Sequence, residues 1–254
     1  MAASQARPLI EVRALAEIAE YEEVVRLQKE IWGFSDVDAL PVRLFIVARK
    51  VGGQIFGAFD GLRLIGFCVA LPAIQAGGGM YLHSNMLGVE EAYRNAGVGR
   101  MLKLAQRDDA LARGIGLIEW TFDPLEMKNA HFNVERLGAV VKRYLLNSYG
   151  VTSSGLHGGL PTDRCVAEWH LASAWVKGKL ADTPLSRPPV EARIEVPNEI
   201  GEMKKTDPAR AREIQRRVSD EFLGLLRQGL TVIGVEKGAD SGWYLLGRWN
   251  ELEN

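Results

Sequence analysis

Residues 87–102 constrain the fold more than any other part of the chain. They read as the end of a strand, a tight turn, and then a helix whose first residues include Gly97 and Gly99. The backbone N–H groups of a first helical turn have no acceptor within the helix, and they lie at the positive end of the helix dipole. A phosphate group binds well at such a place. The segment therefore predicts an α/β protein with an anion site at this turn.

The residues of the turn suit a pyrophosphate in particular. Gly97 and Gly99 have no side chain, so a ligand can approach the main chain closely. Arg94 adds a charged donor that can bind two oxygens at once. No Gly-Lys-Ser/Thr sequence follows, and the third glycine of a dinucleotide fingerprint is missing. Both absences argue against the common nucleotide-binding loops.

Hydrophobic periodicity predicts the remaining elements of the first two thirds of the chain. Strands are expected at residues 10–15, 54–59, 64–71, 81–89, 117–122, 140–146 and 165–171, and helices at residues 16–32, 40–51, 97–113 and 129–137. The dipeptide Asp60-Gly61 marks a hairpin, and Pro72 is expected to end its second strand. The order β-α-α-β-β-β-α-β-α-β-β predicts an α/β (α+β) fold with a mixed, mostly antiparallel central sheet flanked by helices.

The composition divides the chain into three parts. Residues 9–174 are expected to form the main domain, and residues 175–191, rich in Lys, Pro and Ser, a linker. Residues 192–254 predict a β-α-β-β extension, with a helix over 208–228 that begins after Asp207. About 60 residues make a marginal independent core. We therefore expect the extension to pack on the first domain or on a partner subunit, as in a homodimer.

The pattern Arg94-x-x-Gly97-x-Gly99, after a strand that ends at Val89, resembles the acyl-CoA signature of the Gcn5-related N-acetyltransferase (GNAT) superfamily. The element order of residues 9–171 resembles that superfamily too. The resemblance implies acetyl-CoA or another acyl-CoA as co-substrate, with the thioester oxygen bound by a backbone N–H of the bulged strand end. The implied pyrophosphate site is Arg94, Asn95, Ala96, Gly97, Val98, Gly99 and Arg100, and the implied pantetheine site is Leu87, Gly88 and Val89.

Residues 129–139 resemble the superfamily's helix after strand five. In many relatives this helix carries a tyrosine that protonates the departing thiolate, and Val134 occupies that position here. Tyr144, Tyr149 or a water could supply the proton, or the thiolate could leave unaided, since a thiol is not a demanding leaving group. Asn129 and Asn133 lie four residues apart on one helix face and could contact CoA. Capping or a solvated face explains them equally well.

A base is needed because an amine must be neutral to attack a thioester. Strand periodicity places Tyr81, His83, Asn85 and Leu87 on one face. His83 directly, or Asn85 through a water, is therefore a candidate base, although a lone strand histidine is more often a packing residue. Glu119 is the alternative, unless it simply points to solvent.

Two sets of residues could bind the acceptor. Trp32, Phe34, Phe45 and Phe56 could line an acceptor pocket, although such spacing is more often that of core residues. Arg136, Lys142 and Arg143 could bind an acidic acceptor or the 3′-phosphate of CoA, and a solvated charged face is the alternative.

Composition limits the remaining possibilities. The 254 residues include 31 basic and 32 acidic side chains, a net charge of −1, which is unlike the basic surface of a nucleic-acid binder. The histidines and cysteines show no metal-ligand spacing. No apolar leader or membrane-spanning run is visible, so a cytoplasmic protein is expected. The sequence thus predicts an N-acyltransferase that moves an acetyl or longer group, such as succinyl, to a small amine such as an amino acid. An inactive CoA-binding sensor or an interaction protein is the alternative.

Overall fold

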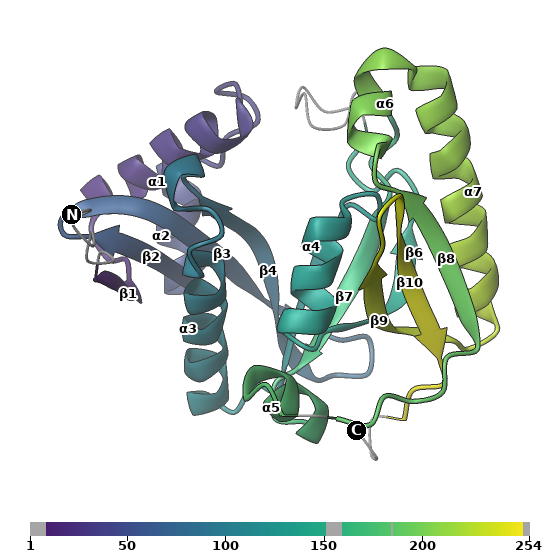
Figure 1. Ribbon diagram of the computed structural model, residues 1–254. Helices are drawn as coiled ribbons and strands as arrows, with labels where there is room; N and C mark the ends of the chain where they lie inside the picture. The colour runs from purple at the N-terminus through teal and green to yellow at the C-terminus, as the bar shows by residue number, and fades with distance from the viewer. Residues whose placement is uncertain (1–8, 151–158, 184, 251–254) are drawn as a thin grey trace, which may run out of the picture. The chain divides into compact units, whose positions relative to one another are not determined.

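The computed structural model describes residues 9–150, 159–183 and 185–250. These residues form two compact units, divided between Ile115 and Gly116 (Figure 1). No helix in the described part of the chain is both long and apolar enough to cross a membrane.

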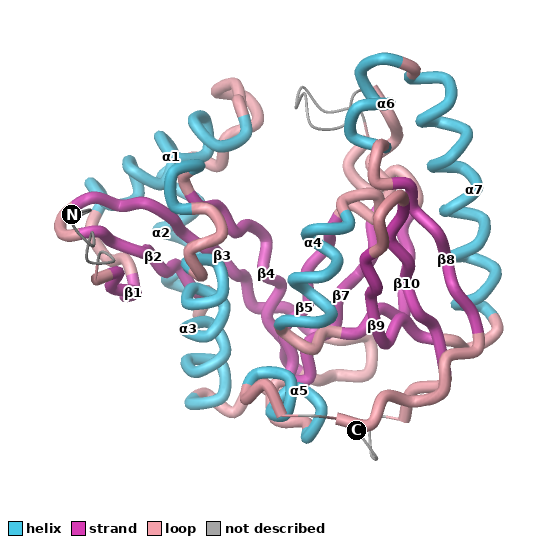
Figure 2. Tube along the Cα trace, viewed as in Figure 1, coloured by secondary structure: helices cyan, strands magenta, loops and turns pink. Residues whose placement is uncertain are grey.

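The first unit is a sheet of four antiparallel strands in the order β1-β2-β3-β4 with helices on both faces (Figure 2). Its elements are β1 (Ile10–Ala14), α1 (Ile18–Trp32), α2 (Val42–Lys50), β2 (Gln54–Asp60), β3 (Arg63–Ile74), β4 (Met80–Val89), the 3₁₀ turn η1 (Glu91–Tyr93) and α3 (Val98–Ala112). The expected elements are thus present, with ends shifted by a few residues. Gly33 ends α1 in the left-handed conformation, at φ 68°, as expected.

Alternation along β3 gives this sheet its two cores. Phe67 and Val69 point to one face, where they pack with buried residues of α1 and α2. Cys68 points to the other face, with Val98 and Leu102 of α3. Helix α3, which carries the predicted anion site, is therefore anchored by its own apolar side against the sheet.

The prediction that Pro72 ends β3 is wrong, because the strand continues to Ile74. In the first unit β3 pairs with β2 only as far as Ala70, whereas its pairing with β4 continues through Pro72↔Leu82. A proline is tolerated where a strand has a neighbour on one side only, since its missing N–H then breaks no ladder bond.

The prediction that Tyr81, His83, Asn85 and Leu87 share one face is also wrong. Ser84 lies opposite Ala70 and Met86 lies opposite Val69, so Asn85 is an extra residue in β4, a β-bulge. The bulge reverses the alternation: Tyr81 and His83 lie on the face of α1 and α2, whereas Leu87 lies on the face of α3.

The second unit is a sheet in the order β5-β7-β6-β9-β10-β8. Its elements are β5 (Leu117–Phe122), α4 (Met127–His131), the π-helical turn η2 (Phe132–Arg136), β6 (Val140–Leu145), β7 (Arg164–His170), α5 (Ala174–Leu180), β8 (Ala192–Pro197), α6 (Ile200–Thr206), α7 (Pro208–Arg227), β9 (Thr231–Lys237) and β10 (Ser241–Gly247). The pairing of Val141 with Val232 joins β6 to β9. The C-terminal strands therefore extend the sheet that begins with β5.

Two helices of the second unit were not expected. Helix α5 lies in the expected linker, where the Ser173 hydroxyl caps it by accepting from the Val176 N–H at 3.1 Å, and Trp175 and Val176 are buried. Helix α6 precedes α7. Asp207 begins α7 as expected, because its carboxylate accepts from the Arg210 N–H at 3.0 Å. The domain limits of 9–174 and 192–254 remain a prediction.

A buried polar cluster connects α3 to the sheet. Lys103, only 3% exposed, donates from Nζ to the Ser84 hydroxyl at 2.8 Å. That hydroxyl donates to Gln106 Oε1 at 3.0 Å, and Gln54 donates to the Gln106 carbonyl at 2.8 Å. Burial lowers the pKa of Lys103 to about 7, although the nearby Cys68 opposes the shift.

Lys103→Met should therefore flatten the pH dependence of stability. The unfolded chain keeps the lysine proton up to about pH 10.4 and the folded chain only to about pH 7, so unfolding takes up a proton between these values. The free energy of unfolding should rise by about 2 to 3 kcal/mol more in wild type than in Lys103→Met between about pH 7 and pH 9.5, measured by urea denaturation. Lys50→Met, on the exposed side of α2, is the control. Equal slopes for wild type and Lys103→Met would show that the buried amine is not the cause.

Candidate functional site

The N-terminus of α3 begins at a glycine turn. Gly97 is the N-cap residue, at φ 88° and ψ −2°, and no side chain of the described residues caps the helix. The Met101 N–H donates to the Gly97 carbonyl at 3.0 Å, which is the first bond of the intrahelical type along α3. The N–H groups of Val98, Gly99 and Arg100 precede it, at the positive end of the helix. This is the geometry of a phosphate site.

The turn before α3 leaves space in front of these donors. Asn95 and Gly97 both have positive φ, 64° and 88°. A Cβ placed on Gly97 would meet no heavy atom within 4 Å, so the main chain is open there. Arg94 is exposed and anchored by a bond from Nε to the Val89 carbonyl at 3.4 Å. Its remaining N–H groups can bind an anion at the turn.

The start of this loop is held by buried charge. Glu90 is 2% exposed and lies 2.7 Å from Arg63 and 3.5 Å from Arg26. Next to it, the Tyr93 hydroxyl donates to Asp60 at 2.7 Å. These contacts come from α1 and the β2–β3 hairpin. The loop is therefore preorganised, which reduces the entropy that a ligand must remove.

Packing explains Gly88 in the predicted pantetheine site. A Cβ at Gly88 would lie 2.9 Å from Ile31, 3.0 Å from Trp32 and 3.1 Å from Phe67. Gly88 is thus needed for α1 to lie against β4. Leu87 and Val89 point to the α3 face. The resemblance implies a bulge at residues 87–89, and the observed bulge lies slightly earlier, at Asn85.

The structure separates the two candidate bases of β4. His83 is partly buried opposite Leu71, a residue of the α1 and α2 face. Asn85 is exposed at the bulge. Because of the bulge, the two side chains do not share the face that strand periodicity predicts for them.

Glu119 lies on a polar face of the second unit. It is 6% exposed, opposite Glu168 in the β5–β7 pair, and its carboxylate lies 2.6 Å from Arg143. Arg143 is therefore not on a merely solvated surface. Sequence periodicity did not reveal Glu168, whose position on this face follows from the strand register.

Tyr144, the candidate general acid, is buried in the second unit at 7% exposure. Its hydroxyl lies 2.9 Å from Ser219 of α7 and donates to Asp163 at 3.4 Å, and its ring stacks on Phe222 at 4.9 Å. Burial raises the pKa of Tyr144 well above its usual value. The sequence hypothesis of a thiolate-protonating Tyr144 does not agree with this packing. Tyr149 is 50% exposed, with its hydroxyl 2.7 Å from Thr121.

The helix after β5 carries the two candidate asparagines. Asn133 is 2% exposed and donates to Asn129 Oδ1 at 3.4 Å, whereas Asn129 is exposed. Val134, which takes the place of the superfamily's tyrosine, is fully buried. A π turn often marks a functional position in a helix. Here η2 begins at Phe132, directly before Asn133.

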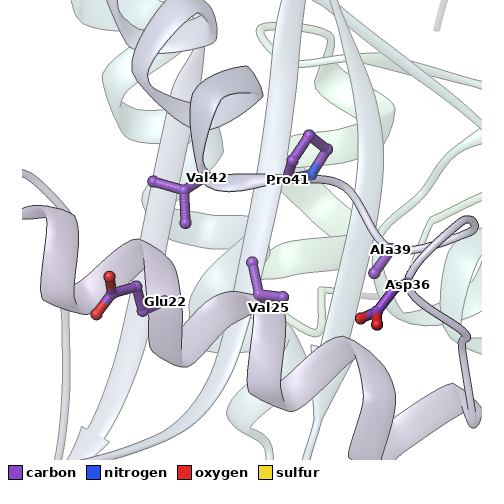
Figure 3. Close-up of a pocket in the computed structure, with 6 residues that line it drawn as sticks. All are labelled: Glu22, Val25, Asp36, Ala39, Pro41 and Val42. Carbon is purple, nitrogen blue, oxygen red and sulfur yellow. The ribbon is translucent and has the colours of Figure 1, made fainter.

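A separate pocket of about 310 Å³ lies between α1 and the start of α2 (Figure 3). Val25 and Val42 point toward each other across it, and Glu22 and Asp36 supply carboxylates. It contains none of the predicted site residues.

Of the four aromatic candidates, Phe45 is fully buried, Phe56 packs in the α3-side core, and Trp32 stacks on Phe34 at 5.4 Å. The core interpretation therefore fits Phe45 and Phe56.

Comparisons with known proteins agree with this arrangement. No model of a known protein family matches the chain. The chain is 25% identical to YhdJ of Bacillus subtilis, an uncharacterized N-acetyltransferase. The match extends over 138 residues, which are 54% of this chain and 96% of that protein.

The fold is shared with many solved structures, including a bacterial and a plant protein. A GNAT-family protein of Desulfovibrio desulfuricans is 16% identical with a TM-score of 0.52, over 64% of this chain and 99% of that one. NAA60 of Arabidopsis thaliana, in complex with acetyl-CoA, is 15% identical with a TM-score of 0.51, over 63% and 99%. The glycine turn at the mouth of α3, the fold and the curated relative together make this chain similar to the Gcn5-related N-acetyltransferases.

Proposed function

We propose that this protein transfers an acetyl group from acetyl-CoA to the primary amine of a small molecule. The N-terminus of α3 carries the proposal, because its uncapped N–H groups and open glycine match a pyrophosphate. The curated relative is named an N-acetyltransferase, and the NAA60 structure contains acetyl-CoA. Both support acetyl-CoA as the donor.

The transfer is direct. The amine nitrogen attacks the thioester carbon, the new C–N bond forms, and the C–S bond breaks to release CoA as a thiol. A backbone N–H at the end of β4 is our candidate to polarise the thioester oxygen, since such donors stabilise a developing oxyanion. Asn129 and Asn133 are candidate CoA contacts from the helix after β5.

Gly97→Ala tests the pyrophosphate site, with Gly114→Ala as a matched control. Both glycines have positive φ, 88° and 74°, and open space at the Cβ position, and they lie at opposite ends of α3. Each alanine should cost about 1 kcal/mol of stability, because the left-handed conformation disfavours a Cβ. Only Gly97→Ala should weaken CoA binding, about 10-fold or more in calorimetry. Equal CoA affinities for the two variants would remove the main support for the proposal.

Glu119 is our preferred base, because it is a carboxylate on a polar face, whereas His83 lies opposite Leu71, a residue that packs against the apolar core of α1 and α2. Glu119→Gln should lower kcat by about 10²-fold or more without changing the affinity for CoA, since general base catalysis contributes on that scale. His83→Gln should change kcat by less than about 3-fold. The opposite ranking of the two variants would assign the base to β4.

Tyr144→Phe should affect stability and not chemistry. The variant loses the one hydrogen bond that the Tyr144 hydroxyl donates, to Asp163 or to Ser219, which costs about 1 to 2 kcal/mol, while Ser219 can still donate to Asp163 at 2.6 Å. The melting temperature should fall, and the rate of thiol release from acetyl-CoA should stay within about 2-fold of wild type. A loss of about 10²-fold in kcat at unchanged melting temperature would make Tyr144 the general acid.

A further inference from the structure

A compact cluster of opposite charges lies on one face of β5, β7 and β6. Strand register sets Glu119 directly opposite Glu168, and both side chains are nearly buried, at 8% and 11% exposure. Like charges in directly opposed positions destabilise a sheet unless cations stand beside them. The chain therefore has to supply cations at this point.

The cations come from β6 through an irregularity in that strand. Val141 lies opposite Ala167 and Arg143 opposite Val166, so Lys142 is an extra residue, a bulge. Adjacent residues of a regular strand point to opposite faces. The bulge lets Lys142 and Arg143 reach the same carboxylate, Glu168.

The two glutamates are held differently. Glu168 lies 3.4 Å from Arg143, 3.3 Å from Lys142 and 3.5 Å from His170. Burial alone would raise the pKa of Glu168, but the hydrogen bond from His170 and the two cations outweigh burial and lower it. Glu168 thus stays ionised as a fixed counter-ion. For Glu119, Arg143 at 2.6 Å is the ion-pair partner that the described residues provide.

In this cluster the cations are more exposed to solvent than the carboxylates. The Arg143 side chain is 51% exposed and Lys142 is 27% exposed, whereas both carboxylates lie beneath them. Arg143 uses Nη2 and Nε for the two glutamates, and a guanidinium has further N–H donors in the same plane. An approaching molecule meets the guanidinium first and the Glu119 carboxylate behind it.

We propose that this cluster binds the acceptor, and that the acceptor carries an anionic group, such as a carboxylate, a few bonds from its amine. This inference rests on the proposed acetyl transfer. Arg143 binds the anion through its outer N–H groups, and Glu119 receives the ammonium. The ammonium gives one proton to the Glu119 carboxylate and becomes the neutral amine that the proposed transfer needs. The second nitrogen proton leaves with the sulfur as the CoA thiol, so the charges balance.

A zwitterionic acceptor suits this cluster because the two glutamates and the two cations already balance. An amine that carries no anionic group would have to compete with Arg143 for the Glu119 carboxylate. An anion that carries no amine could not accept the acetyl group. A charge-assisted bidentate contact is stronger than a neutral one, so the carboxylate should contribute about 10- to 100-fold in kcat/KM.

The test uses the full-length protein, acetyl-CoA and matched sets of acceptors. Each set contains an α-amino acid, its amide and its decarboxylated amine, for several side chains, and thiol release is followed. The amino acids should exceed their amides by about 10- to 100-fold in kcat/KM. Arg143→Gln should reduce that difference to less than about 3-fold, mainly by raising KM for the acids. Arg193→Gln is the matched control. Arg193 lies in β8, its side chain is 53% exposed, and it pairs with Glu236 of β9 at 2.7 Å.

A binding measurement supports the kinetic one. In the presence of CoA, amino acids should raise the melting temperature of wild type more than their amides do, and Arg143→Gln should lose that difference. Arg143→Lys serves if the glutamine variant does not fold, because it keeps the charge and loses the bidentate geometry, and should show an intermediate preference.

Three results would overturn the inference. Wild type could acetylate the amides as well as the acids, or Arg143→Gln could lower both by the same factor, as a purely structural ion pair would. Likewise, amines without a carboxylate could be the better acceptors, and the proposed acetyl transfer would then stand without this substrate class. If no acyl-CoA raises the melting temperature, the proposed function itself fails.

Discussion

The hydrogen-bonding requirement of the α3 N-terminus organises the first unit. The helix begins at a glycine with positive φ, and no side chain of the described residues caps it. Open N–H groups at a helix end are costly when they are shielded from water and useful when an anion reaches them. The rest of the unit supports that end: Val98 and Leu102 bury the apolar side of α3, and Glu90 holds the start of the loop.

A buried hydrogen bond also connects α3 to β4, the strand that precedes the loop. Lys103, one turn after the glycines, binds Ser84 next to the β4 bulge at Asn85. The bulge and the anion site are therefore parts of one packed structure. A change in the ionisation of Lys103 would act on stability directly, because the amine is buried.

The C-terminal elements support the second unit in a similar way. Glu135, in the π turn η2, accepts from Lys179 at 2.6 Å, Arg187 at 2.9 Å and the Val235 N–H of β9 at 2.7 Å. Burial alone would raise the pKa of Glu135, and these contacts outweigh it and keep the carboxylate ionised. The helix after β5 is thereby tied to α5 and to the C-terminal strands. The extension is part of this unit's core, as shown by Tyr144 packing on Phe222.

The sequence is most informative where one residue type has one strong physical meaning. The glycines of the α3 turn, Gly33 after α1 and Asp207 before α7 all have the conformations or bonds that their chemistry predicts. The sequence does not show where a strand gains a residue. The bulges at Asn85 and Lys142 contain no glycine or proline that would mark them, and each changes which side chains share a face. For that reason the shared face in β4 was predicted wrongly and the Glu119–Arg143–Glu168 cluster was not predicted.

The most direct measurement is a crystal structure of the full-length protein with CoA. We expect the diphosphate to accept hydrogen bonds from the main-chain N–H groups of residues 97–100 at the mouth of α3. A diphosphate bound elsewhere, or a protein that does not bind CoA at millimolar concentration, would contradict this expectation.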